Sequence, residues 1–205
     1  MNKRRPNTEE TGSRYLTRSC SDFHIRKDGE DQHPVIEGYF SVFNSNYELW
    51  DGASESIAPG AFDGTISGDV RALIDHETRL VLGRTKAGTL QLRQDEHGLW
   101  GHVDVNPKDV DAMNLVARLE RGDVNQCSFG FDITDEETEI RDDGSVHWTI
   151  KGVKLYEVSV CTFPAYEETG VALRKKDLET IETRKLEAWK AQMRAKLSRE
   201  ESTNA

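Results

Sequence analysis

Residues 125–131 are the most restrictive part of the sequence, because they alternate with the two-residue period of a β-strand. As a strand, they place Cys127, Phe129 and Phe131 on one face and Ser128 and Gly130 on the other. The aromatic face is typical of a protein core. We therefore expect Ser128 to stand off the core, beside a glycine that leaves space around its hydroxyl group.

The composition indicates one domain with polar extensions. Of 205 residues, 36% are hydrophobic and 31% are charged, and the formal net charge is −10. We predict a polar N-terminal extension over residues 1–33, a compact domain over 34–173, and a charged C-terminal amphipathic helix and tail over 174–205. No dense basic block lies mid-chain and no apolar run is long enough to span a bilayer, so we expect neither a nucleic-acid nor a membrane partner. Three cysteines without close spacing argue against a disulfide framework.

The remaining patterns predict a mixed, mainly β fold. Strand-like segments separated by turns cover residues 35–43, 70–76, 99–105, 125–131 and 146–162. Residues 141–145 are typical of a hairpin turn. One helix is expected between Asn106 as N-cap and Gly122 as terminator, with an apolar stripe that includes Val110 and Met113. Residues 174–200 are expected to form an amphipathic helix that either covers the core or docks on a partner.

Three residues outside the apolar pattern have the chemistry of a serine protease. A serine hydroxyl needs a base to take its proton, histidine has a suitable pKa, and a carboxylate orients the imidazole and stabilises its charged form. Ser128, His76 and Glu157 are the candidates for these roles. Their separations of 52 residues (128−76) and 29 residues (157−128) have no local signature, so spacing alone does not pair them.

Strand alternation adds support for Glu157. Glu157 and Ser159 share a strand face that is opposite to their valine neighbours, so Glu157 is expected to stand off the core as Ser128 does. Alternatively, Glu157 is a solvated residue on an exposed sheet. Asp75 and Glu77 flank His76, but as strand neighbours they are expected to point to the other face, which makes them poorer partners for its ring.

Two other chemistries remain open at this stage. Cys127 and His76 are the components of a cysteine peptidase, although a cysteine on an aromatic face is usually an inert buried thiol. A zinc site would draw on four residues, but these lack metal-binding spacing: His97, His102, Cys127 and Cys161. We therefore expect no cofactor and no metal.

Several segments together resemble the prohead maturation proteases of tailed bacteriophages, a serine peptidase family. The similarity runs from about residue 35 to 173 in the family's order. It is carried by residues 38–43, 57–62, His76 with 82–85, 88–90, Asp95 with 98–99, 128–131 and 155–165. The resemblance implies a catalytic triad of His76, Ser128 and Glu157. It also implies a β-barrel-like antiparallel core with flanking α-helices, because the family is similar in fold to herpesvirus assembly proteases.

The resemblance further implies a biological role. Such a protease acts in the host cytoplasm, inside the assembling procapsid. There it cleaves the scaffold or the scaffold-like segment of the major capsid protein, and often cleaves itself. Self-association of the protease is a further candidate interaction. The alternative is a catalytically inactive capsid or scaffold component that keeps the fold. Oxyanion donors are expected to be backbone N–H groups, with Gly83, Arg84 and Gly130 as candidates.

Overall fold

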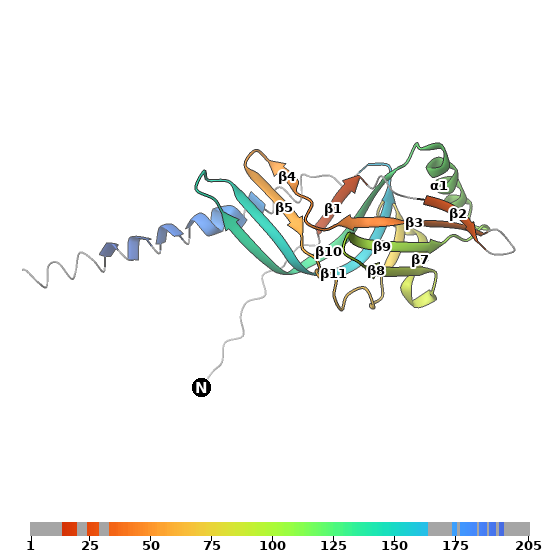
Figure 1. The fold of residues 1–205 in the computed structure, drawn as a ribbon, viewed down its shortest axis with the longest axis horizontal. Coiled ribbons are helices and arrows are strands. Elements are labelled where there is room, and N and C mark those ends of the chain that lie inside the picture. The colour runs from red at the N-terminus through yellow and green to blue at the C-terminus, as the bar shows by residue number, and fades with distance from the viewer. Residues whose placement is uncertain are drawn as a thin grey trace, which may run out of the picture. The chain divides into compact units, whose positions relative to one another are not determined.

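The computed structural model describes residues 14–19, 24–28, 33–163, and 174–194 except 176, 184, 188 and 192. The chain forms two compact units, Met1–Glu167 and Glu168–Ala205. The first holds all the strands formed by the residues just named, and Figure 1 shows its β-rich architecture. Described residues of the second are helical, as predicted for 174–200, and residues 195–200 lie outside the described part. None of the helices formed by described residues is long and apolar enough to cross a membrane.

A long hairpin is the centre of the first unit. Strand β10 (Gln126–Ile140) and strand β11 (Val146–Cys161) pair antiparallel along nearly their whole length (Figure 1). The turn between them closes through a hydrogen bond from Arg141 N to Ser145 O, and Gly144 supplies the left-handed backbone conformation that the turn needs. The predicted strands and hairpin turn are therefore confirmed.

The hairpin belongs to a seven-stranded mixed sheet. The main strand order is β1-β10-β11-β5-β4, and β6 also pairs with β11 and β7. The other members are β1 (Arg14–Ser19), β4 (Tyr47–Trp50), β5 (Ala53–Ile57), β6 (Arg71–Ile74) and β7 (Glu77–Arg84). Because β11 is so long, β5 and β6 both pair with it in parallel, at residues 146–150 and 157–160 respectively.

A second sheet of four strands is fully antiparallel. Its order is β2 (His24–Asp28), β3 (His33–Val42), β9 (Gly98–Asp104) and β8 (Leu90–Gln94), and the short 3-10 helix η1 (Thr85–Ala87) leads into β8. The mainly β prediction is confirmed. This sheet has the expected antiparallel pairing, whereas the mixed sheet adds the parallel pairs of β5 and β6 with β11. The pairings of the described residues form these two sheets.

The aromatic face of β10 lies in the core, as alternation predicts. Phe129 and Phe131 are fully buried and stack on each other with ring centroids 4.9 Å apart. Phe62, from the loop after β5, packs edge-on against Phe129, with ring centroids 5.5 Å apart.

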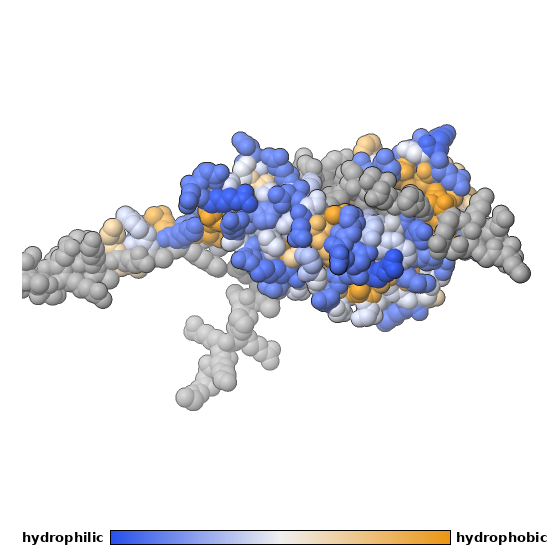
Figure 2. All heavy atoms as spheres, in the orientation of Figure 1, coloured by the Kyte–Doolittle hydropathy of each residue, from blue (hydrophilic) through white to orange (hydrophobic). Residues whose placement is uncertain are grey.

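The surface shown in Figure 2 is mainly hydrophilic, with hydrophobic residues in separate patches, which agrees with the high charged fraction of the sequence.

The helix differs from its prediction at the start and agrees at the end. Helix α1 spans Val110–Arg121, and its N-cap is Asp109, whose carboxylate accepts hydrogen bonds from two first-turn backbone N–H groups. Asn106 caps only the preceding turn, through Lys108 N. Gly122 ends the helix as expected. Of the expected apolar stripe, Met113 packs against the core and Leu115 is buried, whereas Val110 is exposed.

Gly98 provides a stability prediction. A Cβ atom there would lie 1.9 Å from Ser41 O on the neighbouring strand β3, so Gly98→Ala must push two paired strands apart. We expect it to lower the free energy of unfolding by about 3 kcal/mol in urea denaturation, at the upper end of typical overpacking costs. Gly144→Ala is the matched control, because no heavy atom lies within 4 Å and only its positive φ costs about 1 kcal/mol. Equal losses in both variants would contradict this account.

Candidate active site

Ser128 and Glu157 lie on the same face of the mixed sheet. Ser128 of β10 is the cross-strand partner of Ser159 on β11, and Gly130 is the partner of Glu157. Cross-strand partners point to the same side of a sheet, so these four residues form one patch on the face opposite to the aromatic residues. Gly130 itself places no side chain beside the Glu157 carboxylate.

This face is buried, which differs from the expectation from sequence. Ser128 and Ser159 are fully buried and Glu157 is 7% exposed. Alternation places these side chains opposite to Phe129, but it does not report what covers the second face. The polar residues therefore lie in an environment of low dielectric constant, where hydrogen bonds and charge pairs are stronger than in water.

His76 reaches Glu157 from a neighbouring strand. Strand β6 pairs in parallel with β11, so that Ile74 lies beside Val160. The chain then turns at Asp75 and His76, and His76 Nδ1 lies 2.7 Å from Glu157 Oε1. The two side chains are 16% and 9% exposed. A largely buried carboxylate at this distance holds the imidazole in one orientation and favours the tautomer with a proton on Nδ1.

The turn that carries His76 has an unusual backbone. Asp75 and His76 both have positive φ, at 49° and 59°, which L-residues rarely adopt in succession. Asp75 holds the turn to the end of β11, because its carboxylate accepts hydrogen bonds from Thr162 N at 2.7 Å and Thr162 Oγ1 at 3.3 Å. Asp75 is therefore not a partner of the His76 ring, as expected, but the reason is a turn and not strand alternation.

Ser159 binds the second oxygen of Glu157. Its hydroxyl group donates a hydrogen bond to Glu157 Oε2 at 2.6 Å, and both side chains are buried. Each carboxylate oxygen thus has its own partner, His76 on one side and Ser159 on the other. Strand alternation places Ser159 on the same face as Glu157, but by itself it predicts no role for this residue. The available signal was the two-residue spacing on one strand face.

The cysteines do not form a competing site. Cys127 is fully buried on the face opposite to Ser128 and is disulfide-bonded, contrary to the argument from cysteine number. Cys161 is a buried free thiol, and burial raises its pKa to about 12, with further contributions from the charges of Asp75 and Glu157. Neither residue offers an accessible thiolate nucleophile.

The other predicted candidates lie apart from this patch. His97 packs against Tyr39, and His102 lies between Glu37 and Asp104. Across the described part of the chain, no group of three or more His, Cys, Asp or Glu side chains is arranged to hold a metal ion.

The residues expected as oxyanion-hole donors lie at two different distances from Glu157. Gly130 lies opposite Glu157 on β10, whereas Gly83 and Arg84 are on β7, two strands away on the other side. A Cβ atom at Gly83 would lie 2.7 Å from Thr89 O, which accounts for glycine at this position by packing. Gly130 is therefore the candidate nearest to the Ser128 patch.

Comparison with known proteins identifies the family. Residues 21–184 match the model of the family described as Caudovirus prohead serine protease. The chain belongs to this family. It is 32% identical to the prohead protease of Enterobacteria phage HK97, over 84% of this chain and 74% of that protein. The solved structure of the bacteriophage T4 capsid assembly protease matches with a TM-score of 0.45 and 10% identity, covering 73% of this chain and 98% of that one.

The family membership defines the general activity. The chain is a prohead protease of caudovirus capsid assembly, as the resemblance in the sequence indicated.

Proposed function

We propose that the chain is a serine endopeptidase in which Ser128 is the nucleophile, His76 the general base and Glu157 the residue that orients His76. The observation that carries the proposal is the 2.7 Å contact between His76 Nδ1 and Glu157 Oε1, on the sheet face that also bears Ser128. Ser128 is the cross-strand neighbour of Ser159, Ser159 binds Glu157, and Glu157 binds His76. This continuous series of neighbours supports grouping the three residues in one site.

The mechanism follows from the protonation states that this geometry favours. Glu157 accepts a hydrogen bond from Nδ1–H of His76, so Nε2 carries the lone pair that takes the proton from Ser128 Oγ. Oγ then attacks the scissile carbonyl carbon, and the imidazolium returns its proton to the departing amine. Water enters, loses a proton to His76 and attacks the acyl-enzyme, which releases the new carboxyl terminus and restores Ser128. The Glu157 carboxylate stabilises the imidazolium in both steps.

The substrates that we propose are polypeptides of the assembling procapsid. They are the scaffold protein or the scaffold-like segment of the major capsid protein, together with the protease chain itself, and cleavage takes place inside the procapsid. Enclosure in a shell raises the local concentration of enzyme and substrate together, so a modest intrinsic activity suffices there. The domain of residues 34–173 is proposed as the catalytic part, with the helical segment from 174 as a candidate for self-processing.

Two measurements test the proposal. The protease is co-expressed with the major capsid protein of the same phage, and intact-mass spectrometry follows cleavage of both chains. In parallel, diisopropyl fluorophosphate, which modifies activated serines, is added to the purified protein, and the modified residue is located by peptide mapping. We expect capsid-protein cleavage and a single adduct on Ser128, absent from His76→Ala. Processing that proceeds without labelling of Ser128, or that chelators abolish, would exclude the serine mechanism.

A catalytically inactive capsid or scaffold component is the second candidate, and the complete burial of Ser128 is the observation that favours it. A substrate reaches Ser128 only if the covering atoms move. The co-expression experiment separates the two functions, because an inactive component leaves every chain uncleaved in the assembled particle.

Ser159 is expected to position Glu157. Ser159→Ala removes a hydrogen bond to a buried carboxylate, and a bond of this kind contributes about 1.5–3 kcal/mol, so we expect kcat to fall at least tenfold with KM little changed. Ser159→Thr restores the hydroxyl group and should recover activity. Equal kcat values for Ser159→Ala and the wild type would show that Ser159 has only a structural role.

A further inference from the structure

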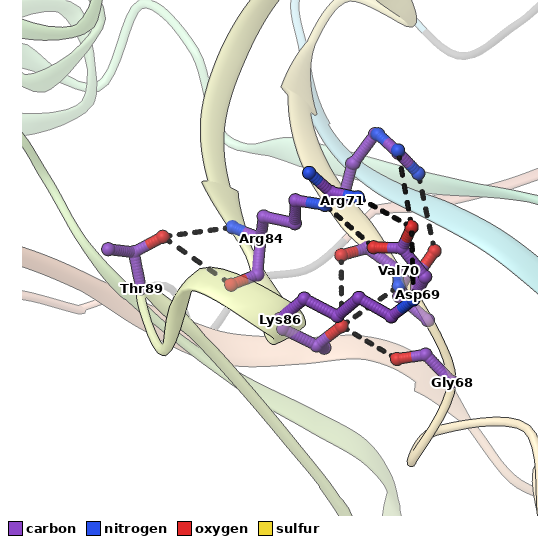
Figure 3. Close-up of polar contacts among 8 residues, drawn as sticks. Gly68, Asp69, Val70, Arg71, Arg84, Lys86 and Thr89 are labelled. Atoms are coloured by element: carbon purple, nitrogen blue, oxygen red, sulfur yellow. Dashed lines mark hydrogen bonds and ion pairs between the residues drawn. The ribbon is translucent and has the colours of Figure 1, made fainter.

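A basic cluster lies on the surface near the candidate active site. Arg71, Arg84 and Lys86 surround the single carboxylate of Asp69, as Figure 3 shows. Three cations and one anion give this Asp69 cluster a formal charge of +2 (3−1), within a chain whose net charge is −10. Among the residues that the structure describes, the ion pairs of these three side chains all go to Asp69.

Arg84 and Asp69 form the rigid part of the cluster. Arg84 Nε and Nη2 each donate to one oxygen of Asp69 at 2.7 Å, in the two-pronged geometry that matches guanidinium to carboxylate. The hydrogen bond from Arg84 is the largest cause that lowers the pKa of Asp69 to about 2, so Asp69 stays ionised at neutral pH. Thr85 anchors the same segment, because its hydroxyl group donates to Gly68 O and accepts from Val70 N.

The other two cations are held weakly. Arg71 makes two long contacts with Asp69, from Nη2 to Oδ2 at 3.4 Å and from Nη1 to the backbone oxygen at 3.3 Å, and Lys86 Nζ lies 4.0 Å from Oδ2. One carboxylate that is already bound on both oxygens does not neutralise three cations. A purely structural role, in which Arg84 and Asp69 join the loop before β6 to β7, explains these two residues but not the two additional positive charges.

Strand register places the cluster in a row with the candidate site. Glu157 of β11 pairs with Arg71 of β6, and Arg71 pairs with Arg84 of β7. Register partners share a sheet face, and neighbouring strands are about 4.8 Å apart, so Arg84 lies about 10 Å from Glu157 along this row. An extended peptide advances about 3.3 Å per residue. Ser128 lies on β10, one strand beyond Glu157, so Arg84 is about 14 Å from the nucleophile across the sheet. A substrate residue about four or five positions from the scissile bond therefore reaches the cluster.

We propose that the Asp69 cluster is a substrate subsite that binds an Asp or Glu side chain close to the scissile bond. This inference rests on the proposed peptidase function. The side chains of Arg71, Arg84 and Lys86 are 42%, 42% and 66% exposed, so they are accessible to a substrate. A substrate carboxylate supplies the negative charge that Asp69 alone does not, and the fixed Arg84–Asp69 pair defines the position of the cluster before binding.

The experiment uses the wild-type chain and a tryptic digest of a bacterial proteome as the peptide library, with cleavage sites mapped by mass spectrometry. We expect Asp and Glu to be enriched at one fixed position near the cleaved bond. Two synthetic peptides that differ only by Glu or Gln at that position then give the specificity ratio, kcat/KM for Glu over kcat/KM for Gln. We expect a ratio of at least 10 in the wild type that falls on addition of 0.5 M NaCl.

The double variant Arg71→Gln/Lys86→Gln should lower this ratio to about 1 while the Gln peptide is cleaved at the wild-type rate. It leaves the Arg84–Asp69 pair intact, and its thermal midpoint confirms folding. Arg79→Gln is the matched control, because Arg79 is an exposed arginine of β7 that pairs with Glu77 outside the cluster. Its specificity ratio should stay at the wild-type value.

The outcomes separate this inference from the proposed function. Cleavage that depends on Ser128 but shows no acidic preference, or an equal loss of preference in Arg79→Gln, overturns the subsite and leaves the peptidase intact. A wild-type chain that cleaves neither the library nor its capsid protein overturns the proposed function, and the subsite with it.

Discussion

Ser128→Ala is expected to abolish processing, with a fall in kcat of about 10⁴–10⁶ and a normally folded protein. The alanine side chain lacks the hydroxyl group that forms the acyl-enzyme, and it fits the same fully buried position without creating a large cavity. The rate is measured as single-turnover cleavage of the capsid-protein segment identified by co-expression. Circular dichroism and the thermal midpoint establish that the variant is folded.

Ser41→Ala is the matched control for this substitution. Ser41 is also a fully buried serine, but it lies on β3 in the other sheet, so its loss should leave kcat unchanged. A second comparison uses the double variant Ser128→Ala/His76→Ala. Residues that act as one catalytic unit are strongly non-additive, so the double variant should be no slower than Ser128→Ala alone. A further large loss would mean that His76 acts independently of Ser128.

Glu157→Gln is expected to lower kcat by about 10⁴ with a smaller change in KM. The amide has nearly the same shape but carries no charge, so it does not stabilise the His76 imidazolium and no longer favours the tautomer with the proton on Nδ1. The site is buried, and water therefore does not compensate for the missing charge. The measurement is the cleavage rate of the same capsid-protein segment over a range of substrate concentrations, which separates kcat from KM.

Glu137→Gln serves as the control for removal of one carboxylate. Glu137 is exposed on the outer part of β10 and pairs with Lys151, far along the strand from Ser128, so kcat should not change. The losses should rank Ser128→Ala above Glu157→Gln above Ser159→Ala. If Glu157→Gln remained within tenfold of wild type while Ser128→Ala was inactive, Glu157 would not be the residue that orients the base.

Local patterns were sufficient to predict the secondary structure around the nucleophile. Alternation in residues 125–131 correctly separated Ser128 from Phe129 and Phe131, because successive side chains of any strand point to opposite faces. Gly122 was correctly placed at the end of α1, since the left-handed C-cap conformation favours glycine. The N-cap was wrong because Asn106 and Asp109 are both good capping residues, and backbone geometry outside the local pattern selects Asp109.

The order of the strands in the mixed sheet could not be predicted from the sequence. The parallel pairing of β6 with β11 brings His76 to Glu157, and it joins segments separated by more than 80 residues. Strand partners are selected by how the whole core packs, and no periodicity within one strand reports its neighbours. The strands of the N-terminal segment, β1 and β2, are likewise defined by their partners β10 and β3.

The sequence by itself determined the family, the mainly β composition and the residue types of the candidate site, because alternation, turn residues and motif identity are all local properties. Only the tertiary structure decided that the Ser128 face is buried, that a left-handed turn at Asp75 and His76 directs the imidazole to Glu157, and that Ser159 holds the second oxygen of that carboxylate. It also decided that Arg71, Arg84 and Lys86 converge on Asp69. These are properties of side chains from different strands, and folding brings such strands together through long-range packing.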